Sequence, residues 1–228
     1  PPGSQSSPPA VDRQELRADL LSMVSRTKKK RDIGPLVGNQ LKLEQILEGL
    51  ESVLEDSPLD GGVLHGIVIR PSENKREILE SVRLTPEGGL EGDRWALGCW
   101  RKTDDGRPHP DVQVSIMNSR YMDLIAHCKE NWPIAGDNLY ADLSLSQEYL
   151  KEGQLLRVGS AVVQITAEPH MACRKFALRF GMDAARVVNT KMGRFLRLRG
   201  VYARVVIPGM IQLGDRFEKI SRDPRLKV

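Results

Sequence analysis

Two stretches near the N-terminus repeat their apolar residues at helical spacing. The segment DRQELRADLLSMV places four apolar residues on one face, behind Asp12 and Glu15 in capping-box positions. The segment QLKLEQILEGLESVLED, from Gln40 to Asp56, repeats the same spacing. The pattern predicts an N-terminal helical extension over residues 12–60, either packed on the main domain as a hairpin or serving as a docking arm. The Pro- and Ser-rich residues 1–11 offer little to bury and are expected to form a disordered tail.

From Gly61 onward the pattern changes to short β-branched runs separated by turn residues. VLHGIVIRP and VQVSIM read as strands, and the segment NSRYMDLIAHC returns to helical spacing. QLLRVGSAVVQIT reads as a hairpin around Gly159 and Ser160, and GVYARVVIPGMIQLGDRFEKI as another around Pro208 and Gly209. Many short strands with close turns predict a mainly β fold, a closed or nearly closed barrel with peripheral helices. The domain is expected over residues 61–221, with a short tail at 222–228.

Composition places the chain among water-soluble globular proteins. Hydrophobic residues make up 40% and charged residues 28%, and no window is apolar enough to cross a bilayer. The first residues lack the basic start and apolar stretch of a signal peptide. Three cysteines without CxxC spacing give neither a disulfide framework nor a zinc site. These features predict a cytoplasmic protein with no membrane partner.

Positive charge is concentrated toward the C-terminus. Residues 165–228 hold 14 Lys and Arg against 5 Asp and Glu, a net charge of +9 within a chain of net charge +4. Such an excess favours an anionic partner, a phosphate-bearing small molecule or nucleic acid, although a solvated basic face is the commoner meaning of charge alone. Aromatic residues make up only 5% of the chain, which argues against a stacking platform for single-stranded nucleic acid.

One cysteine stands out by its setting. Cys173 lies where a strand leads into an apolar helical repeat that ends at Gly181, so it is expected at a helix start. Free N–H groups there, with Arg174 and Lys175 next in the chain, favour the thiolate and predict a reactive sulfur. The alternative is a small buried hydrophobe, which is how Cys99 and Cys128 are interpreted.

Several other residues are candidates for ligand binding. His170 is a base, a ligand or a turn residue. Asp137 and Asn138 follow a glycine and either bind a ligand or shape an Asx turn. The basic segment that contains Arg197 and Arg199 ends at Gly200, a residue that would let a phosphate approach the backbone. Surface arginines are the alternative.

Four motifs in order then define a resemblance. GGLEGDRW, GDNL, EPHMACRKF and RGVYARVVIPGMIQLGD, over about Val63 to Ile220, are similar to the MOSC domain, the C-terminal domain of molybdenum cofactor sulfurases. The resemblance is closest to the stand-alone bacterial MOSC proteins. It implies a β-barrel-like fold whose pocket holds a molybdopterin-type cofactor. Cys173 then matches the family's cysteine, which carries sulfur as a persulfide or ligates molybdenum.

The resemblance also implies partners and limits. It implies a sulfurtransferase or an enzyme that reduces small N-hydroxylated substrates, with Cys173 catalytic. The pterin phosphate is then expected to be held by arginines together with the loop of Gly136, Asp137 and Asn138. No pyridoxal phosphate module is present in the sequence, so that cofactor is not expected, and a separate sulfur- or electron-donor protein would be needed. The alternative is a non-catalytic barrel whose basic C-terminal third binds a phosphorylated metabolite or nucleic acid.

Overall fold

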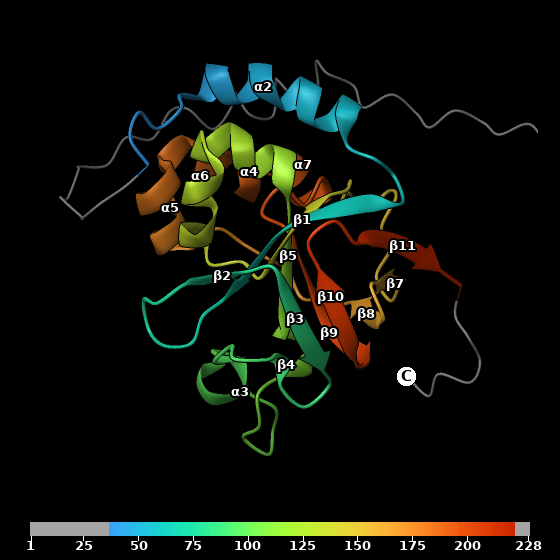
Figure 1. The fold of residues 1–228 in the computed structure, drawn as a ribbon. Coiled ribbons are helices and arrows are strands. Elements are labelled where there is room, and N and C mark those ends of the chain that lie inside the picture. Colours follow the sequence, from blue (N-terminus) through green and yellow to red (C-terminus); the bar gives the residue numbers. More distant parts are fainter. Residues whose placement is uncertain (1–36, 222–228) are drawn as a thin grey trace, which may run out of the picture.

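The structure is a computed structural model that describes residues 37–221. The expected disordered tail at 1–11, the expected helix from Asp12 and the tail at 222–228 lie outside the described residues. Within them, the chain forms a β-barrel covered on one side by a layer of helices (Figure 1).

Seven strands close the barrel. They are β1 (Gly62–Ile69), β5 (Val114–Asn118), β6 (Leu139–Asp142), β7 (Leu155–Val158), β8 (Ala161–Ile165), β9 (Val201–Ile207) and β11 (Arg216–Ile220). Their order is β11-β7-β8-β9-β5-β6-β1, and pairing of β1 with β11 completes the ring. A ring of strands removes the exposed sheet edges. The predicted barrel is confirmed.

A few short strands lie outside the ring. β2 (Glu77–Leu79) pairs antiparallel with β1. The strands β3 (Ser81–Thr85), β4 (Gly89–Leu90) and β10 (Gly209–Gln212) form a separate sheet. Their apolar residues join those of the strands in the barrel core. Residues 37–221 also contain the 3-10 helices η1 (Pro110–Val112) and η2 (Lys129–Ala135).

One predicted hairpin is confirmed and the other is wrong. β7 and β8 pair across Gly159, whose φ of 54° suits the tight turn. At Pro208, by contrast, the chain leaves the barrel, because β10 pairs with β3 and not with β9. Gly209 is required there because a side chain would run into the backbone of Ser160 and Ala161.

The helices form a second packed layer with its own core. They are α2 (Leu43–Asp56), α4 (Ser119–Ala126), α5 (Arg174–Phe180), α6 (Met182–Asn189) and α7 (Lys191–Phe195), while the short α3 (Trp95–Gly98) lies at the other end of the molecule (Figure 1). Their apolar faces meet in a cluster separate from the barrel interior. The helices therefore contribute a hydrophobic core of their own to the domain.

The predicted helix at residues 40–56 is confirmed as α2, and it is packed rather than free. Its residues Ile46 and Leu50 are fully buried against α4 and α6. Figure 1 shows α2 lying across the outer side of α4 and α6. α2 therefore packs on the main domain, while the other helix of the expected hairpin lies outside the described residues.

We expect Ile46→Ala to lower the free energy of unfolding by about 2–5 kcal/mol, because it leaves a cavity in the helical layer. Glu48→Ala, on the exposed face of the same helix, is the control and should change stability by less than about 0.5 kcal/mol. Urea unfolding of both variants measures the difference. Equal stability of the two variants would mean that α2 is separable from the domain.

Candidate functional site

A pocket of about 810 Å³ gathers the candidate thiol and several cations. Its walls come from the end of β1, the 72–76 loop, α3 with the residues after it, and the 168–175 segment that joins β8 to α5. Five basic side chains line it: Arg70, Arg76, Arg94, Lys175 and Arg199. Its size is that of a small-molecule or cofactor site.

Cys173 lies on the wall of this pocket, in the predicted position at a helix start. It is the N-cap residue of α5 and is exposed, and Lys175 lines the same pocket. Gly181 ends the helix with a φ of 100°, as expected. Arg174, also exposed, is not among the lining residues and contributes only its charge nearby.

Behind the thiol, Arg199 and Asp137 form a buried ion pair. Nη1 of Arg199 donates to Oδ2 of Asp137 at 2.7 Å, and their side chains are only 7% and 1% exposed. The Arg199 guanidinium also stacks 4.7 Å from the ring centre of Phe176, on the first turn of α5. Arg199 therefore supports the helix that presents Cys173. Because Nη1 of Arg199 is bound to Asp137, its guanidinium is not free to bind a ligand through both arms.

His170 completes this cluster. Its Nε2 lies 3.7 Å from Oδ1 of Asp137, too far for a hydrogen bond, and its ring centre is 4.2 Å from that of Tyr202. Burial, together with the charges of Arg199 and Arg70, lowers the pKa of His170 well below its usual 6.5. The imidazole is therefore neutral at physiological pH.

Three polar atoms of the cluster are buried and have no hydrogen-bond partner within residues 37–221. They are Oδ1 of Asp137, Nδ1 of His170 and Nε of Arg199. Buried polar atoms in native proteins almost always find partners. The cluster thus has unsatisfied donors and acceptors just behind this wall of the pocket.

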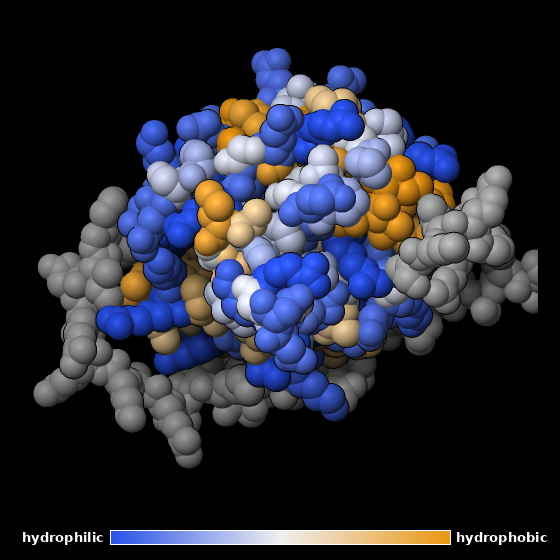
Figure 2. All heavy atoms as spheres, turned by 90° about the horizontal axis from the view of Figure 1, so that it is seen from below, coloured by the Kyte–Doolittle hydropathy of each residue, from blue (hydrophilic) through white to orange (hydrophobic). Residues whose placement is uncertain are grey.

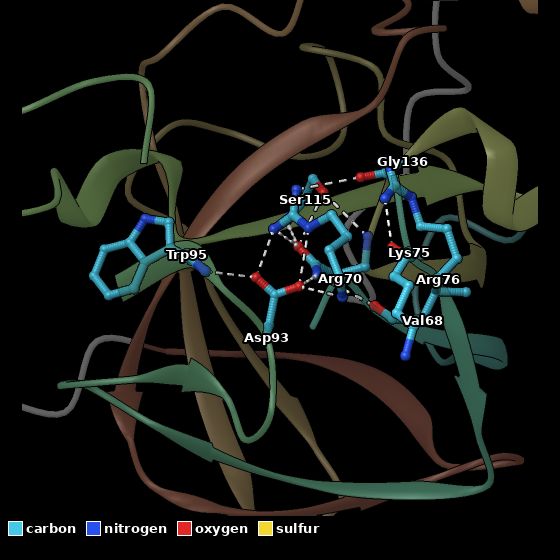
Figure 3. Close-up of polar contacts among 9 residues, drawn as sticks. Val68, Arg70, Lys75, Arg76, Asp93, Trp95, Ser115 and Gly136 are labelled. Atoms are coloured by element: carbon cyan, nitrogen blue, oxygen red, sulfur yellow. Dashed lines mark hydrogen bonds and ion pairs between the residues drawn. The ribbon is translucent and has the colours of Figure 1, made fainter. Parts of the chain in front are cut away.

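A second buried network holds Arg70 (Figure 3). Asp93 accepts from Nε of Arg70 at 2.9 Å and from Nη2 at 3.0 Å, a bidentate pair. Burial opposes the charge of Arg70, but the Asp93 carboxylate outweighs it and raises the pKa of Arg70. Backbone N–H of Trp95 also donates to Asp93, at 2.9 Å, so the network fixes the start of α3.

Asn138 also belongs to this network. Its Oδ1 accepts from Nη2 of Arg70 at 3.1 Å and from Oγ of Ser115 at 3.1 Å, and its Nδ2 donates to Asp93 at 3.2 Å. Asn138 and Asp137 are fully buried. They lie beneath the pocket, where they orient arginines, and neither is among the lining residues.

Arg197 and Gly200 are not among the residues that line the pocket. Arg197 donates to the carbonyl of Leu150 at 2.6 Å. Gly200, with a φ of 97°, has its open side against the carbonyl of Ile116, so it serves the close approach of backbone to β5. The suggestion that Gly200 admits a phosphate is therefore wrong, because protein backbone already fills that space.

Sequence reasoning missed Arg70, Asp93, Arg76 and Arg94 as site residues. GGLEGDRW is one of the four motifs of the resemblance, and its Asp93 and Arg94 were the available signal. Arg70 lies near the end of the quoted strand segment VLHGIVIRP, but neither it nor Arg76 lies in the four motifs, so only the fold places these two residues in the pocket. Cys99 also lines the pocket, next to Trp100, although its side chain is largely buried.

The three cysteines should differ in reactivity. Cys173 and Cys128 are both exposed, but the thiol of Cys128 hydrogen-bonds to the carboxylate of Glu130, whereas Cys173 shares its pocket with Lys175 and four arginines. We expect alkylation of Cys173 to be about tenfold faster than that of Cys128 at mildly acidic pH, with Cys99 protected in the folded protein. Mass-resolved labelling measures the three rates. Faster labelling at Cys128 would contradict the assignment.

Comparison with known proteins identifies the family. The MOSC domain matches residues 104–218, half of the chain, and the chain therefore belongs to the MOSC domain family. It is similar in structure to the YuaD protein from Bacillus subtilis, with 18% identity, a TM-score of 0.52 and coverage of 71% of this chain and 97% of that one. For YiiM from Escherichia coli the identity is 20%, the TM-score 0.46 and the coverage 72% of both chains. A search of curated proteins gave no match.

At 18% identity, the structural similarity to YuaD shows a shared fold. Within residues 37–221 there is neither a helix long and apolar enough to cross a membrane nor a group of three His, Cys, Asp or Glu side chains placed to hold a metal ion. The surface seen from the end where α3 and β4 lie is largely hydrophilic, with separate hydrophobic patches (Figure 2).

Proposed function

We propose that this protein binds a molybdenum cofactor of the molybdopterin type in the pocket and uses Cys173 as the protein's sulfur next to the metal. The observation that carries the proposal is the exposed Cys173 on the wall of a large, cation-lined pocket. MOSC family membership supports the choice of cofactor. The buried nitrogens without partners at Arg76, Arg199 and His170 fit an anionic, polar ligand.

When bound, the cofactor supplies a metal that exchanges two electrons and takes up or releases an oxygen atom. Cys173 offers the soft thiolate ligand that suits such a metal. Lys175 and Arg94 supply positive charge to the anionic ligand, and Trp95 and Trp100 cover part of the pocket wall. His170, held neutral, offers its Nδ1 as a hydrogen-bond partner.

The proposed reaction is reduction of a small N-hydroxylated substrate. The N–O bond breaks, two electrons and two protons enter, and the products are the amine and water. The electrons come from a separate electron-donor protein. The chain's own part is to bind the substrate against the thiol, to orient it with the lining cations and to limit the access of water.

Sulfur carriage is the second candidate, and the exposure of Cys173 favours it. A persulfide must be handed from one protein to another, so its sulfur must be reachable from solvent. In this case a cysteine desulfurase would transfer one sulfur atom to the Cys173 thiolate, and no net electrons would be needed from outside.

Binding of nucleic acid through the basic C-terminal third is less well supported by the geometry. Arg194, Arg197 and Arg204 bind protein acceptors, at Asn189, Leu150 and Gln164 respectively. These arginines are tied to separate parts of the fold and do not form one basic stripe.

Intact-protein mass spectrometry distinguishes the two uses of Cys173. The apoprotein is incubated with a cysteine desulfurase and cysteine, and Cys128→Ser and Cys173→Ser are compared. Ligation of molybdenum predicts no sulfur adduct on Cys128→Ser, together with pterin and molybdenum in protein made by a cofactor-producing host. A stable one-sulfur adduct that is lost in Cys173→Ser would establish sulfur carriage instead.

A further inference from the structure

Two of the three cysteines line the same cavity. Cys99 follows the last residue of α3, Cys173 precedes the first residue of α5, and both are among the residues that line the pocket. Cys173 is exposed, whereas Cys99 is only 9% exposed. Cys128 is exposed but does not line the pocket. The fold therefore gives the pocket one accessible thiol and one sheltered thiol.

An ion pair ties together the two segments that carry these thiols. Nη1 of Arg101 pairs with Oε2 of Glu168, and Glu168 itself lines the pocket. Arg101 is two positions after Cys99, and Glu168 is five positions before Cys173. The guanidinium and the carboxylate thus hold the turn after α3 against the segment that leads to α5.

Tyr202, on β9, makes a second connection. Its hydroxyl accepts a hydrogen bond from the side chain of Trp100, the residue after Cys99. Its side chain packs against the apolar cluster that contains Cys99. Its ring centre lies 4.2 Å from that of His170, three positions before Cys173. A single side chain therefore contacts both of the segments that carry a thiol.

The backbone around both thiols lies outside the paired strands. α3 is a single turn of four residues, and residues 166–173 belong to no helix or strand. A disulfide requires the two Cα atoms to lie about 4.4–6.8 Å apart. Connecting segments adjust more readily than paired strands, because no ladder of backbone hydrogen bonds has to break. Closure of a disulfide therefore involves these two segments and leaves the barrel strands paired.

We propose that Cys99 and Cys173 form a redox pair, in which a peroxide oxidises Cys173 and Cys99 then closes a disulfide. With hydrogen peroxide, the O–O bond breaks, an S–O bond forms at Cys173, and the products are a sulfenic acid and one water. The Cys99 thiol then attacks that sulfur, so that an S–S bond replaces the S–O bond and a second water leaves. The two thiols together give two electrons and two protons to the peroxide. A dithiol reverses the reaction by thiol–disulfide exchange.

The two thiols have the unequal settings that such a pair needs. Cys173 is exposed and shares the pocket with Lys175 and four arginines, which is the kind of setting in which a thiol is oxidised first. Cys99 is sheltered from bulk solvent but opens onto the same cavity, so it meets the oxidised sulfur rather than the oxidant. A thiol held near a sulfenic acid stops oxidation at a stage that thiols can reverse.

The disulfide would occupy the sulfur that the proposed function uses. While it is closed, Cys173 can neither ligate a metal nor carry a persulfide, so the pocket is inactive until a dithiol reduces it. This consequence rests on the proposed function. The redox pair itself requires neither molybdenum nor a sulfur donor.

Non-reducing peptide mapping and intact-protein mass spectrometry of the full chain test the pair. Every protein carries Cys128→Ser, which removes the exposed thiol outside the pocket. With stoichiometric hydrogen peroxide we expect this protein to lose two hydrogens and to yield peptides linked through Cys99 and Cys173, and dithiothreitol should restore both thiols. Adding Cys99→Ser should make Cys173 reach the sulfinic acid about tenfold faster in excess peroxide, because no thiol then intercepts the sulfenic acid.

A matched variant and a second substitution complete the test. Cys173→Ser in the same background should leave Cys99 reduced, because Cys99 is sheltered. Cys99→Ala keeps an apolar group in the buried cluster and repeats the measurement should Cys99→Ser lower the urea midpoint. The proposal is overturned if no link between Cys99 and Cys173 forms, or if sulfinic acid appears at the same rate with and without Cys99.

The same oxidation, repeated on protein from a cofactor-producing host, separates the redox pair from the proposed function. A cofactor bound at Cys173 should slow closure of the disulfide. A chain that acquires no molybdenum and still closes the disulfide would contradict the proposed function and support the pair. A chain that binds molybdenum but forms no disulfide in its cofactor-free form would overturn the pair and leave the proposed function standing.

Discussion

Replacing Arg199 by alanine should lower the free energy of unfolding by about 3–5 kcal/mol, a large share of the roughly 5–15 kcal/mol that stabilises a domain. The substitution leaves the Asp137 carboxylate buried without its cation, at a side-chain exposure of 1%. It also removes the guanidinium that stacks on Phe176, so the start of α5, where Cys173 lies, loses support.

A double-mutant cycle separates the ion pair from the packing. Asp137→Asn alone and Arg199→Met alone should each destabilise, because each leaves the charge of the other residue buried without its partner. Arg199→Met combined with Asp137→Asn should recover most of the loss, since no buried charge is then left unpaired. Urea unfolding of the single and double variants gives the coupling energy. If the single losses simply add, Arg199 and Asp137 do not depend on each other and the pair is misassigned.

Gly200→Ala should destabilise the protein by about 3–5 kcal/mol through two costs that act together. The backbone at Gly200 has a φ of 97°, which side chains rarely adopt, and a Cβ would run into the backbone of Ile116 and Met117. Strand backbone cannot move aside as a flexible side chain would.

Gly214 provides the matched control for this substitution. Its φ is 90°, but a Cβ there would have no atom within 4 Å, so Gly214→Ala should cost only about 1–2 kcal/mol for the backbone conformation. Denaturant midpoints of both variants measure the difference. A Gly200→Ala protein as stable as Gly214→Ala, with impaired ligand binding, would instead favour the role in phosphate approach that the sequence suggested.

The local elements were predictable because local spacing encodes them. The helical repeat of α2, the hairpin at Gly159 and the helix start at Cys173 all depend on residues within one or two turns of each other. The pairing of the strand after Pro208 was not predictable, because whether β10 pairs with β9 or with β3 depends on which strand lies alongside in the fold. That pairing joins residues far apart in sequence.

The site was predictable only in part, for the same reason. Four of the candidate residues from the sequence line the pocket, namely His170, Cys173, Lys175 and Arg199. The partners of Arg70 lie 23 and 68 positions away, at Asp93 and Asn138, so no local pattern reveals that network. Arg197 and Gly200 stood beside Arg199 in sequence, but the backbone carries the side chain of Arg197 toward Leu150 and turns the open side of Gly200 to β5.

We propose above that the pocket holds a molybdenum cofactor beside the Cys173 sulfur. The most direct measurement is the molybdenum and pterin content per chain of wild type, Cys173→Ser and the control Cys128→Ser, each purified from a host that makes the cofactor. We predict stoichiometric molybdenum and pterin in wild type and Cys128→Ser, and loss of most molybdenum in Cys173→Ser. Wild-type protein free of both, or Cys173→Ser carrying as much molybdenum as Cys128→Ser, would contradict the account.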